Sequence, residues 1–112
     1  MSKLNIISII PARSNSKRIK NKNIAKYKNK PLIAHSILQS IKSKYVNRTI
    51  VSTDSKKYAN IAKKYGAEVP FLRPKNISKD SSTDLECFNH CLKYLKKHEN
   101  YIPDIIVHLR PT

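Results

Sequence analysis

The chain has 112 residues, of which 39% are hydrophobic, so it is long enough for one domain with a modest core. Its 23 lysines and arginines outnumber its 7 acidic residues and give a formal net charge of +16. That charge favours anionic partners such as nucleotides, nucleic acid or acidic lipid, but the cations recur along the whole chain, so local clusters are more informative. The two cysteines lie close together in sequence, which argues against a disulfide framework and is typical of a reducing cytoplasm. No apolar run is long enough to span a membrane.

The first predicted strand leads directly into a cationic loop. Residues Leu4–Ile10 are almost continuously apolar, which favours a strand buried on both faces of a parallel sheet. Pro11 cannot donate to the hydrogen-bond ladder, so we expect the strand to end there. The loop that follows has five cations and no acid: Arg13, Lys17, Arg18, Lys20 and Lys22. Because open α/β sheets bind ligands beyond the carboxyl ends of their strands, we predict a polyanion site at this loop.

Helical and strand patterns alternate through the rest of the chain. After a short irregular stretch at Ile24–Lys30, Pro31 is expected to begin a helix that runs to about Lys42. The later predicted elements are a strand at Arg48–Thr53, a helix capped by Asp54 or Ser55 and ended by Gly66, a short strand at Glu68–Leu72 broken by Pro70, a helix near Thr83–His98 and a strand at Asp104–Leu109. This order predicts an α/β fold with a doubly wound, mostly parallel sheet. The chain stops just where its fourth strand reaches the edge that carries Arg13, so we expect residues 1–112 to be a single, partial domain truncated after that strand.

A phosphate site in this chain has to rely mainly on side-chain cations and on whatever loop amides are free, because one glycine cannot build either of the common glycine-rich phosphate loops. Arg13 can donate two parallel hydrogen bonds, and Lys17 and Lys22 are point charges on flexible stems. Ser16 offers a hydroxyl, and Asn23 an amide that can contact a base or sugar. An exposed basic loop without a ligand is the alternative interpretation of the same residues.

Several strings of the sequence together resemble the CTP:acylneuraminate cytidylyltransferases, the CMP-sialic acid synthetases. The strings are IIPAR at 9–13, SK at 16–17, KN at 22–23, KPLI at 30–33, IVSTD at 50–54, KYGAEVPFLRP at 64–74, Asp80 with Ser82 and Thr83, and LRPT at 109–112. The resemblance covers essentially the whole chain. It implies the amino-terminal part of such an enzyme, with a Rossmann-like fold of the nucleotide-diphospho-sugar transferase type.

The resemblance also implies an activity and a site. The activity is transfer of CMP from CTP to a nonulosonic, sialic-type acid, with release of pyrophosphate. The implied catalytic residues are Arg13, Lys17 and Lys22, and the implied nucleotide-binding residues are Ala12, Arg13, Ser16, Asn23, Arg73, Ser82 and Arg110. The cofactor would be Mg²⁺, with its ligands in a carboxy-terminal part absent from these 112 residues, so no residue here is predicted to bind metal. The enzyme is expected to be cytoplasmic and homodimeric at full length, without membrane or nucleic-acid partners, and the chain alone to be inactive.

Three alternatives stand beside this interpretation. The first is a small basic nucleic-acid-binding module, and the second is an inactive truncated remnant. The third is a zinc site formed by Cys87, His90, Cys91 and His98. The helix from Cys87 to His98 would span roughly 16 Å, so one ion cannot bind all four side chains. Two thiols beside apolar residues are more typical of a core.

Overall fold

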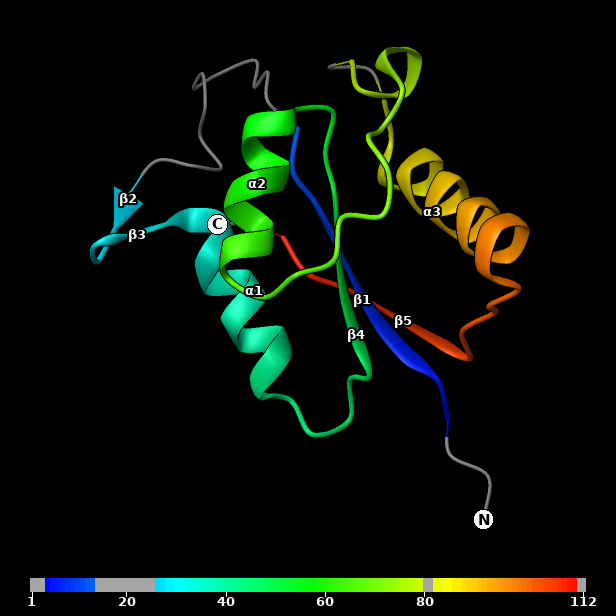
Figure 1. Cartoon of the computed structure of the whole chain (residues 1–112), viewed down its shortest axis with the longest axis horizontal. Helices are drawn as coiled ribbons and strands as arrows, with labels where there is room; N and C mark the ends of the chain where they lie inside the picture. The colour runs from blue at the N-terminus through cyan, green and yellow to red at the C-terminus, as the bar shows by residue number, and fades with distance from the viewer. Residues whose placement is uncertain (1–3, 14–25, 80–81, 111–112) are drawn as a thin grey trace.

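A computed structural model describes residues 4–13, 26–79 and 82–110, and its centre is a three-stranded parallel sheet (Figure 1). The strand order is β4-β1-β5, with β1 in the middle. The bounds are Ile6–Pro11 for β1, Arg48–Ser52 for β4 and Ile105–His108 for β5. In the register, Ile9 pairs with Ile50 on one side and with His108 on the other. The parallel α/β fold predicted from the sequence is therefore confirmed.

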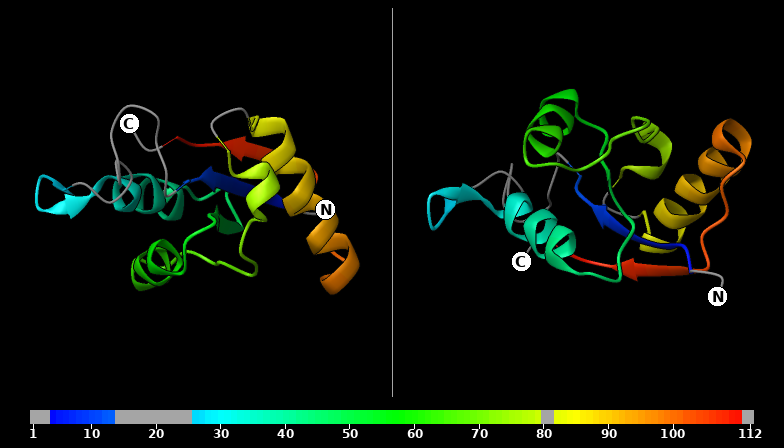
Figure 2. Two further views of the ribbon diagram at one scale, coloured as in Figure 1. Left: turned by 90° about the horizontal axis from the view of Figure 1, so that it is seen from above. Right: turned by 60° about the horizontal axis from the view of Figure 1, so that its bottom comes forward.

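Among the described residues, three α-helices cover the two faces of the sheet (Figure 2). They are α1 at Leu32–Lys42, α2 at Lys56–Lys64 and α3 at Asp84–Glu99. Helices α1 and α2 pack on one face and α3 on the other, so the chain winds outward from β1 to β4 and then returns through α3 to the opposite side of β1. This is the doubly wound arrangement that the alternating pattern predicts.

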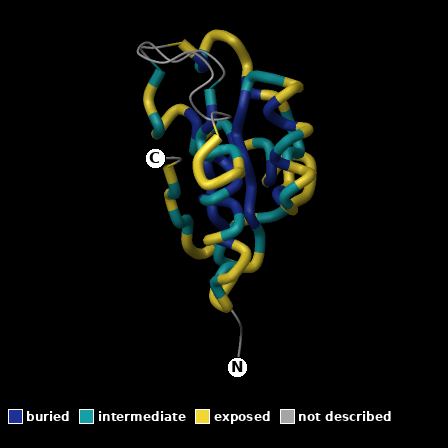
Figure 3. Tube along the Cα trace, turned by 90° about the vertical axis from the view of Figure 1, so that its left-hand side faces the viewer, coloured by how far each residue is buried: buried dark blue, intermediate teal, exposed yellow. Residues whose placement is uncertain are grey.

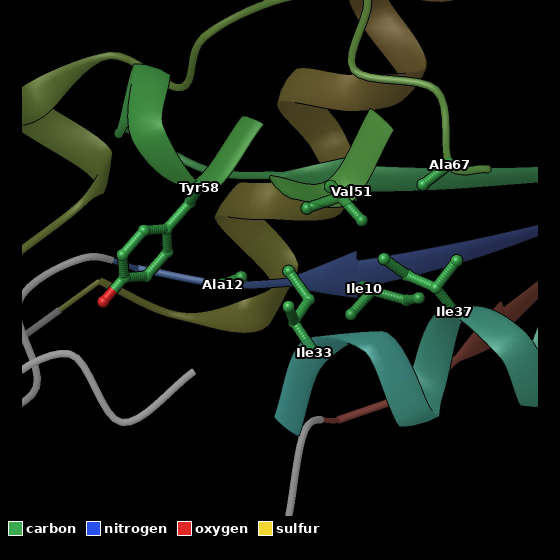
Figure 4. Close-up of a cluster of buried hydrophobic side chains, with 8 residues drawn as sticks. Ile10, Ala12, Ile33, Ile37, Val51, Tyr58 and Ala67 are labelled. Atoms are coloured by element: carbon green, nitrogen blue, oxygen red, sulfur yellow. The ribbon is translucent and has the colours of Figure 1, made fainter. Parts of the chain in front are cut away.

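The side chains of β1 alternate between two cores. Ile10 and Ala12 point to the α1–α2 face, where they meet Ile33, Ile37, Val51, Tyr58, Ala62 and Ala67 (Figure 4). Ile7 and Ile9 point to the α3 face, where they meet Ile50, Cys87, Cys91 and Leu95. Each of these four residues, three in β1 and Ala12 just beyond it, is fully buried, and the buried centre of the molecule follows this strand (Figure 3). The apolar run at the start of the sequence is thus explained by burial on both faces.

Local side-chain contacts fix where α2 and α3 begin. Ser55, rather than Asp54, caps α2, because its hydroxyl accepts a hydrogen bond from the Tyr58 N–H at 3.2 Å. Thr83 and Glu86 form a reciprocal capping box at the start of α3. Pro31 lies one residue before α1 with extended backbone, at the end of a short strand, so the prediction that it is the first helical residue was wrong by one position.

Two other predictions from the sequence need correction. The strand expected at Glu68–Leu72 is reduced to one parallel bridge between Glu68 and Ile50. Glu68 exchanges hydrogen bonds with Thr49 and Val51, but Pro70 lacks the N–H needed to continue the ladder. Within the stretch predicted to be irregular, a hairpin of β2 (Lys26–Tyr27) and β3 (Lys30–Pro31) forms through a turn with positive φ at both central residues.

Gly66 provides a test of the turn that ends α2. Its φ is +103°, and a Cβ built there would lie 2.9 Å from Cδ1 of Ile41 on α1. We expect Gly66→Ala to lower the free energy of unfolding by about 1–2 kcal/mol, measured by urea denaturation, because an L side chain is strained at this φ. In an Ile41→Val background the clashing methyl is gone, so the penalty should fall but not vanish. An equally large penalty in both backgrounds would show that the contact with Ile41 is not part of the cost.

Candidate functional site

The carboxyl ends of the three parallel strands meet at one edge of the sheet. The Ala12 N–H donates to the Ser52 carbonyl at 2.9 Å, which extends the pairing of β1 with β4 by one residue. The Leu109 N–H donates to the Ile9 carbonyl at 3.3 Å and extends the pairing with β5. The chain therefore delivers Arg13 and Arg110 to the same edge. This agrees with the expectation from the sequence that the fourth strand reaches the edge that carries Arg13.

Only the beginning of the cationic loop lies in the part of the chain that the structure describes. Arg13 is half-buried, two residues beyond the end of β1, so its backbone is held close to the sheet. Ala12 is fully buried in the α1–α2 core, and its backbone N–H donates to the Ser52 carbonyl. The other predicted residues of this loop, which are Ser16, Lys17, Lys22 and Asn23, lie outside the described residues, and their roles stay predictions.

Arg73 is buried at this edge and is bound to the end of β4. Only 4% of it is exposed. Its Nε donates to the Ser52 hydroxyl at 3.0 Å and its Nη2 to the Ser52 carbonyl at 2.6 Å, while its backbone N–H donates to the Thr53 carbonyl at 2.8 Å. Among the described residues, no carboxylate is in ion-pair contact with Arg73.

A buried guanidinium that has no acidic partner within the described ranges makes its surroundings positive. Burial is the main reason that the pKa of His90 lies below its usual value, and the charge of Arg73 adds to that decrease. An anion brought close to Arg73 would therefore be stabilised by a charge that water screens little. The prediction that Arg73 contacts a nucleotide stays a prediction, but the structure gives its side chain a partner already.

Asp84 joins the ends of α3 and β5. Its Oδ2 accepts a hydrogen bond from Nη2 of Arg110 and lies 3.4 Å from Nε2 of His108. Arg110 is also held through its backbone, because its carbonyl accepts from the Ser36 hydroxyl on α1 at 3.2 Å. The predicted site residue Arg110 is thus tied to both helical layers.

The predicted site residue Ser82 lies just before α3 and contacts the backbone of Lys79. Its hydroxyl accepts from the Lys79 N–H at 2.9 Å, and its own N–H donates to the Lys79 carbonyl at 2.9 Å. The capping box of Thr83 and Glu86 follows directly. The Ser82 side chain is therefore engaged with the backbone of Lys79 at the start of α3.

Sequence reasoning missed Ser52 and Asp84 as parts of this edge. Ser52 ends a β-branched strand, and its hydroxyl and carbonyl acquire a role only when Arg73 folds back onto them. Asp84 lies just outside the motif strings that carry the family resemblance. Its position in the first turn of a capped helix was a usable signal, because the chain returns to the carboxyl edge at each helix start.

Comparison with known proteins identifies the family of this fold. The profile described as cytidylyltransferase matches residues 7–110. The chain belongs to the cytidylyltransferase family. It is 36% identical over 109 residues to the CMP-N,N'-diacetyllegionaminic acid synthase of Legionella pneumophila, a match that covers 97% of this chain and 47% of the relative. It is 40% identical over 96 residues to the N-acylneuraminate cytidylyltransferase of Escherichia coli, covering 86% and 23%.

Solved structures support the same fold. A CMP:2-keto-3-deoxy-manno-octonic acid synthetase complexed with CTP superposes with a TM-score of 0.74 at 20% identity, over 96% of this chain and 40% of that one. A cytidylyltransferase from Leptospira borgpetersenii superposes with a TM-score of 0.69 at 25% identity, over 96% and 42%. The chain thus spans less than half the length of each of these cytidylyltransferases.

The described residues of this cytidylyltransferase chain do not gather into a metal centre. No group of three or more histidine, cysteine, aspartate or glutamate side chains is placed to hold an ion in the described ranges. Cys87 and Cys91 are fully buried in the α3 core, in agreement with the interpretation of these thiols as packing residues. In the same ranges, no helix is long and apolar enough to cross a membrane.

The buried thiols allow a test of how well the α3 core is closed. Burial raises the pKa of Cys91 to about 12 and also raises the pKa of Cys87, so both stay protonated at about pH 8. We expect the folded chain not to react with Ellman's reagent under conditions that label free cysteine, and to release two reactive thiols on adding guanidinium. Rapid labelling of the folded chain would contradict the packing of α3 on the sheet.

The contribution of the two Arg73–Ser52 hydrogen bonds to stability can be tested by substitution. We expect Arg73→Lys to lower the free energy of unfolding by about 1–3 kcal/mol, measured by urea denaturation, because one ammonium cannot replace both contacts with Ser52. Ser52→Ala should cost less, since it removes the hydroxyl and leaves the carbonyl contact. The two losses should not add in the double variant, because both changes remove the same Nε contact. Strict additivity would show that the hydroxyl contact does not stabilise the fold.

Proposed function

We propose that residues 1–112 form the CTP-binding domain of an enzyme that transfers CMP from CTP to a nonulosonic acid. The observation that carries the proposal is the arrival of Arg13, Arg73 and Arg110 at the carboxyl edge of one parallel sheet, within a chain of the cytidylyltransferase family. This is the edge at which open α/β sheets bind ligands. Three guanidiniums there suit a triphosphate, which offers several anionic oxygens.

The proposed reaction needs positioning and charge stabilisation more than a covalent group on the protein. A hydroxyl oxygen of the sugar acid attacks the α-phosphorus of CTP, the new O–P bond forms in line with the bond that breaks, and the electron pair leaves with pyrophosphate. The proton of that hydroxyl is released. Arg13 would orient the triphosphate from a backbone held by β1, and Lys17 and Lys22 would offset charge on the departing pyrophosphate.

The names of the relatives support the class of acceptor but do not select one sugar. Relatives include synthases or cytidylyltransferases of N,N'-diacetyllegionaminic acid, N-acylneuraminate and, in Campylobacter jejuni, pseudaminic acid, the last at 38% identity over 106 residues. The acceptor is proposed at the level these names share, a nonulosonic acid. A cytoplasmic location and a homodimer are proposed on the same resemblance.

Mg²⁺ is proposed as the counter-ion of the triphosphate on the family resemblance alone. The described carboxylates do not supply a ligand set for it, since Asp84 is engaged by Arg110 and His108, and Glu68 and Glu99 bind Arg48. We therefore derive no step of the reaction through a metal ion. The residues of this chain are assigned to binding and orienting the nucleotide.

The test is a titration of the 112-residue chain with nucleotides in the presence of Mg²⁺. We expect CTP to bind at least about tenfold more tightly than ATP, a difference of about 1.4 kcal/mol in binding free energy. Arg13→Lys should weaken CTP binding, because a point charge cannot replace a bidentate fork. Lys96→Ala, a change at an exposed lysine near the far end of α3, is the matched control and should leave the affinity unchanged.

A parallel titration with duplex DNA tests the alternative of a nucleic-acid-binding module. On the proposed function the DNA should bind only weakly and with a steep loss of affinity as salt is raised, because scattered surface lysines provide nonspecific attraction. Tight DNA binding that resists salt, together with equal affinity for CTP and ATP, would overturn the proposal in favour of a nucleic-acid-binding module.

A further inference from the structure

Hydrogen bonds of the main chain hold the backbone of Arg110 at the edge of the sheet. Leu109 continues the ladder with β1 through its 3.3 Å hydrogen bond to Ile9, and the Arg110 carbonyl accepts from Ser36 on α1. The side chain extends from this fixed root and is exposed, with 67% of its surface accessible. A long exposed side chain on a rigid backbone needs a further contact if it is to point in one direction.

Asp84 provides that contact from an equally fixed position. It is the first residue of α3, directly after the Thr83 cap, whose hydroxyl accepts from the Glu86 N–H at 3.1 Å. Its carboxylate takes a hydrogen bond from Nη2 of Arg110. The same oxygen, Oδ2, lies 3.4 Å from Nε2 of His108, whose ring stands edge-on against Phe88 with centroids 4.8 Å apart. The carboxylate is thus contacted by His108, the last residue of β5, and by Arg110, two residues beyond it.

Stability does not account for this pair. Both partners are accessible, at 67% for Arg110 and 34% for Asp84, and exposed ion pairs contribute little to folding. What the contact does fix is the direction of the guanidinium. The guanidinium has five N–H donors, so a single carboxylate contact leaves it able to bind a second acceptor.

We propose that Asp84 is a positioning residue that aims the guanidinium of Arg110 at the bound nucleotide. This inference rests on the proposed CTP site, because it requires the nucleotide to lie at the edge that Arg110 faces. Arg110 would contact an acceptor oxygen of CTP with the donors that Asp84 does not use. Asp84 itself would not touch the nucleotide.

The sign of one substitution distinguishes positioning from simple charge repulsion. If Asp84 only added negative charge near a triphosphate, Asp84→Asn would tighten CTP binding, because it removes a like charge. If Asp84 aims Arg110, the same change should weaken CTP binding by roughly fivefold to tenfold, the range of one misdirected charge-assisted hydrogen bond. Asp84→Glu, which restores the carboxylate, should recover much of that loss.

Glu86→Gln is the matched control. It removes one negative charge from the same turn of α3 and keeps a capping-box side chain, and no contact joins Glu86 to Arg110 among the described residues. We expect it to leave CTP affinity unchanged or slightly increased. Thermal unfolding of all variants should stay close to that of the wild-type chain, which would separate an effect on binding from one on folding.

The decisive measurement is a double-variant cycle on CTP affinity. In an Arg110→Gln background, Asp84→Asn should have no further effect, because there is no guanidinium left to aim. Equal effects of Asp84→Asn in both backgrounds, or tighter binding in the wild-type background, would overturn the positioning role while leaving the proposed function intact. A wild-type chain that shows no preference for CTP would overturn both.

Discussion

The carbonyl oxygen of Ser52 joins the sheet to the candidate site. It accepts the Ala12 N–H at 2.9 Å and Nη2 of Arg73 at 2.6 Å. The first bond fixes the exit of β1 relative to β4, and the second fixes a buried charge relative to both. A carbonyl oxygen has two lone pairs, so it can accept both bonds at once. The exit of the chain toward Arg13 and the position of the Arg73 guanidinium therefore depend on one backbone acceptor at the end of β4.

The three arginines of this edge differ in how they are held, and the difference suggests different contributions to binding. Arg73 is buried and fixed by Ser52, so it acts mainly through a positive potential that water screens little. Arg110 is accessible and tied by a carboxylate on α3, so it can reach a ligand directly. Arg13 follows the central strand of the sheet. The high net charge of the chain is of less consequence than this local arrangement.

The sequence predicted the central sheet and its helices well, because each has a strong local signal. The apolar run of β1, the β-branched run of β4 and the caps at Ser55 and Thr83 all lie in contiguous residues. The expected strand at Glu68–Leu72 is reduced to one bridge because Pro70 has no N–H to donate to the ladder, whatever the β-propensity of its neighbours. The hairpin at Lys26–Pro31 was missed because its turn has positive φ at a lysine as well as an asparagine, and lysine gives no signal for that conformation.

By itself, the sequence determined the order of the main strands and helices and the motifs shared with the cytidylyltransferases. Both depend only on residues that are close to one another along the chain. The tertiary structure alone decided which partners the arginines have. Arg73 reaches back 21 residues to Ser52, and Arg110 reaches back 26 residues to Asp84. Such contacts depend on which strands become neighbours and on which face of the sheet each helix packs. The assembly of the sheet with its helices sets both, and no local propensity encodes them.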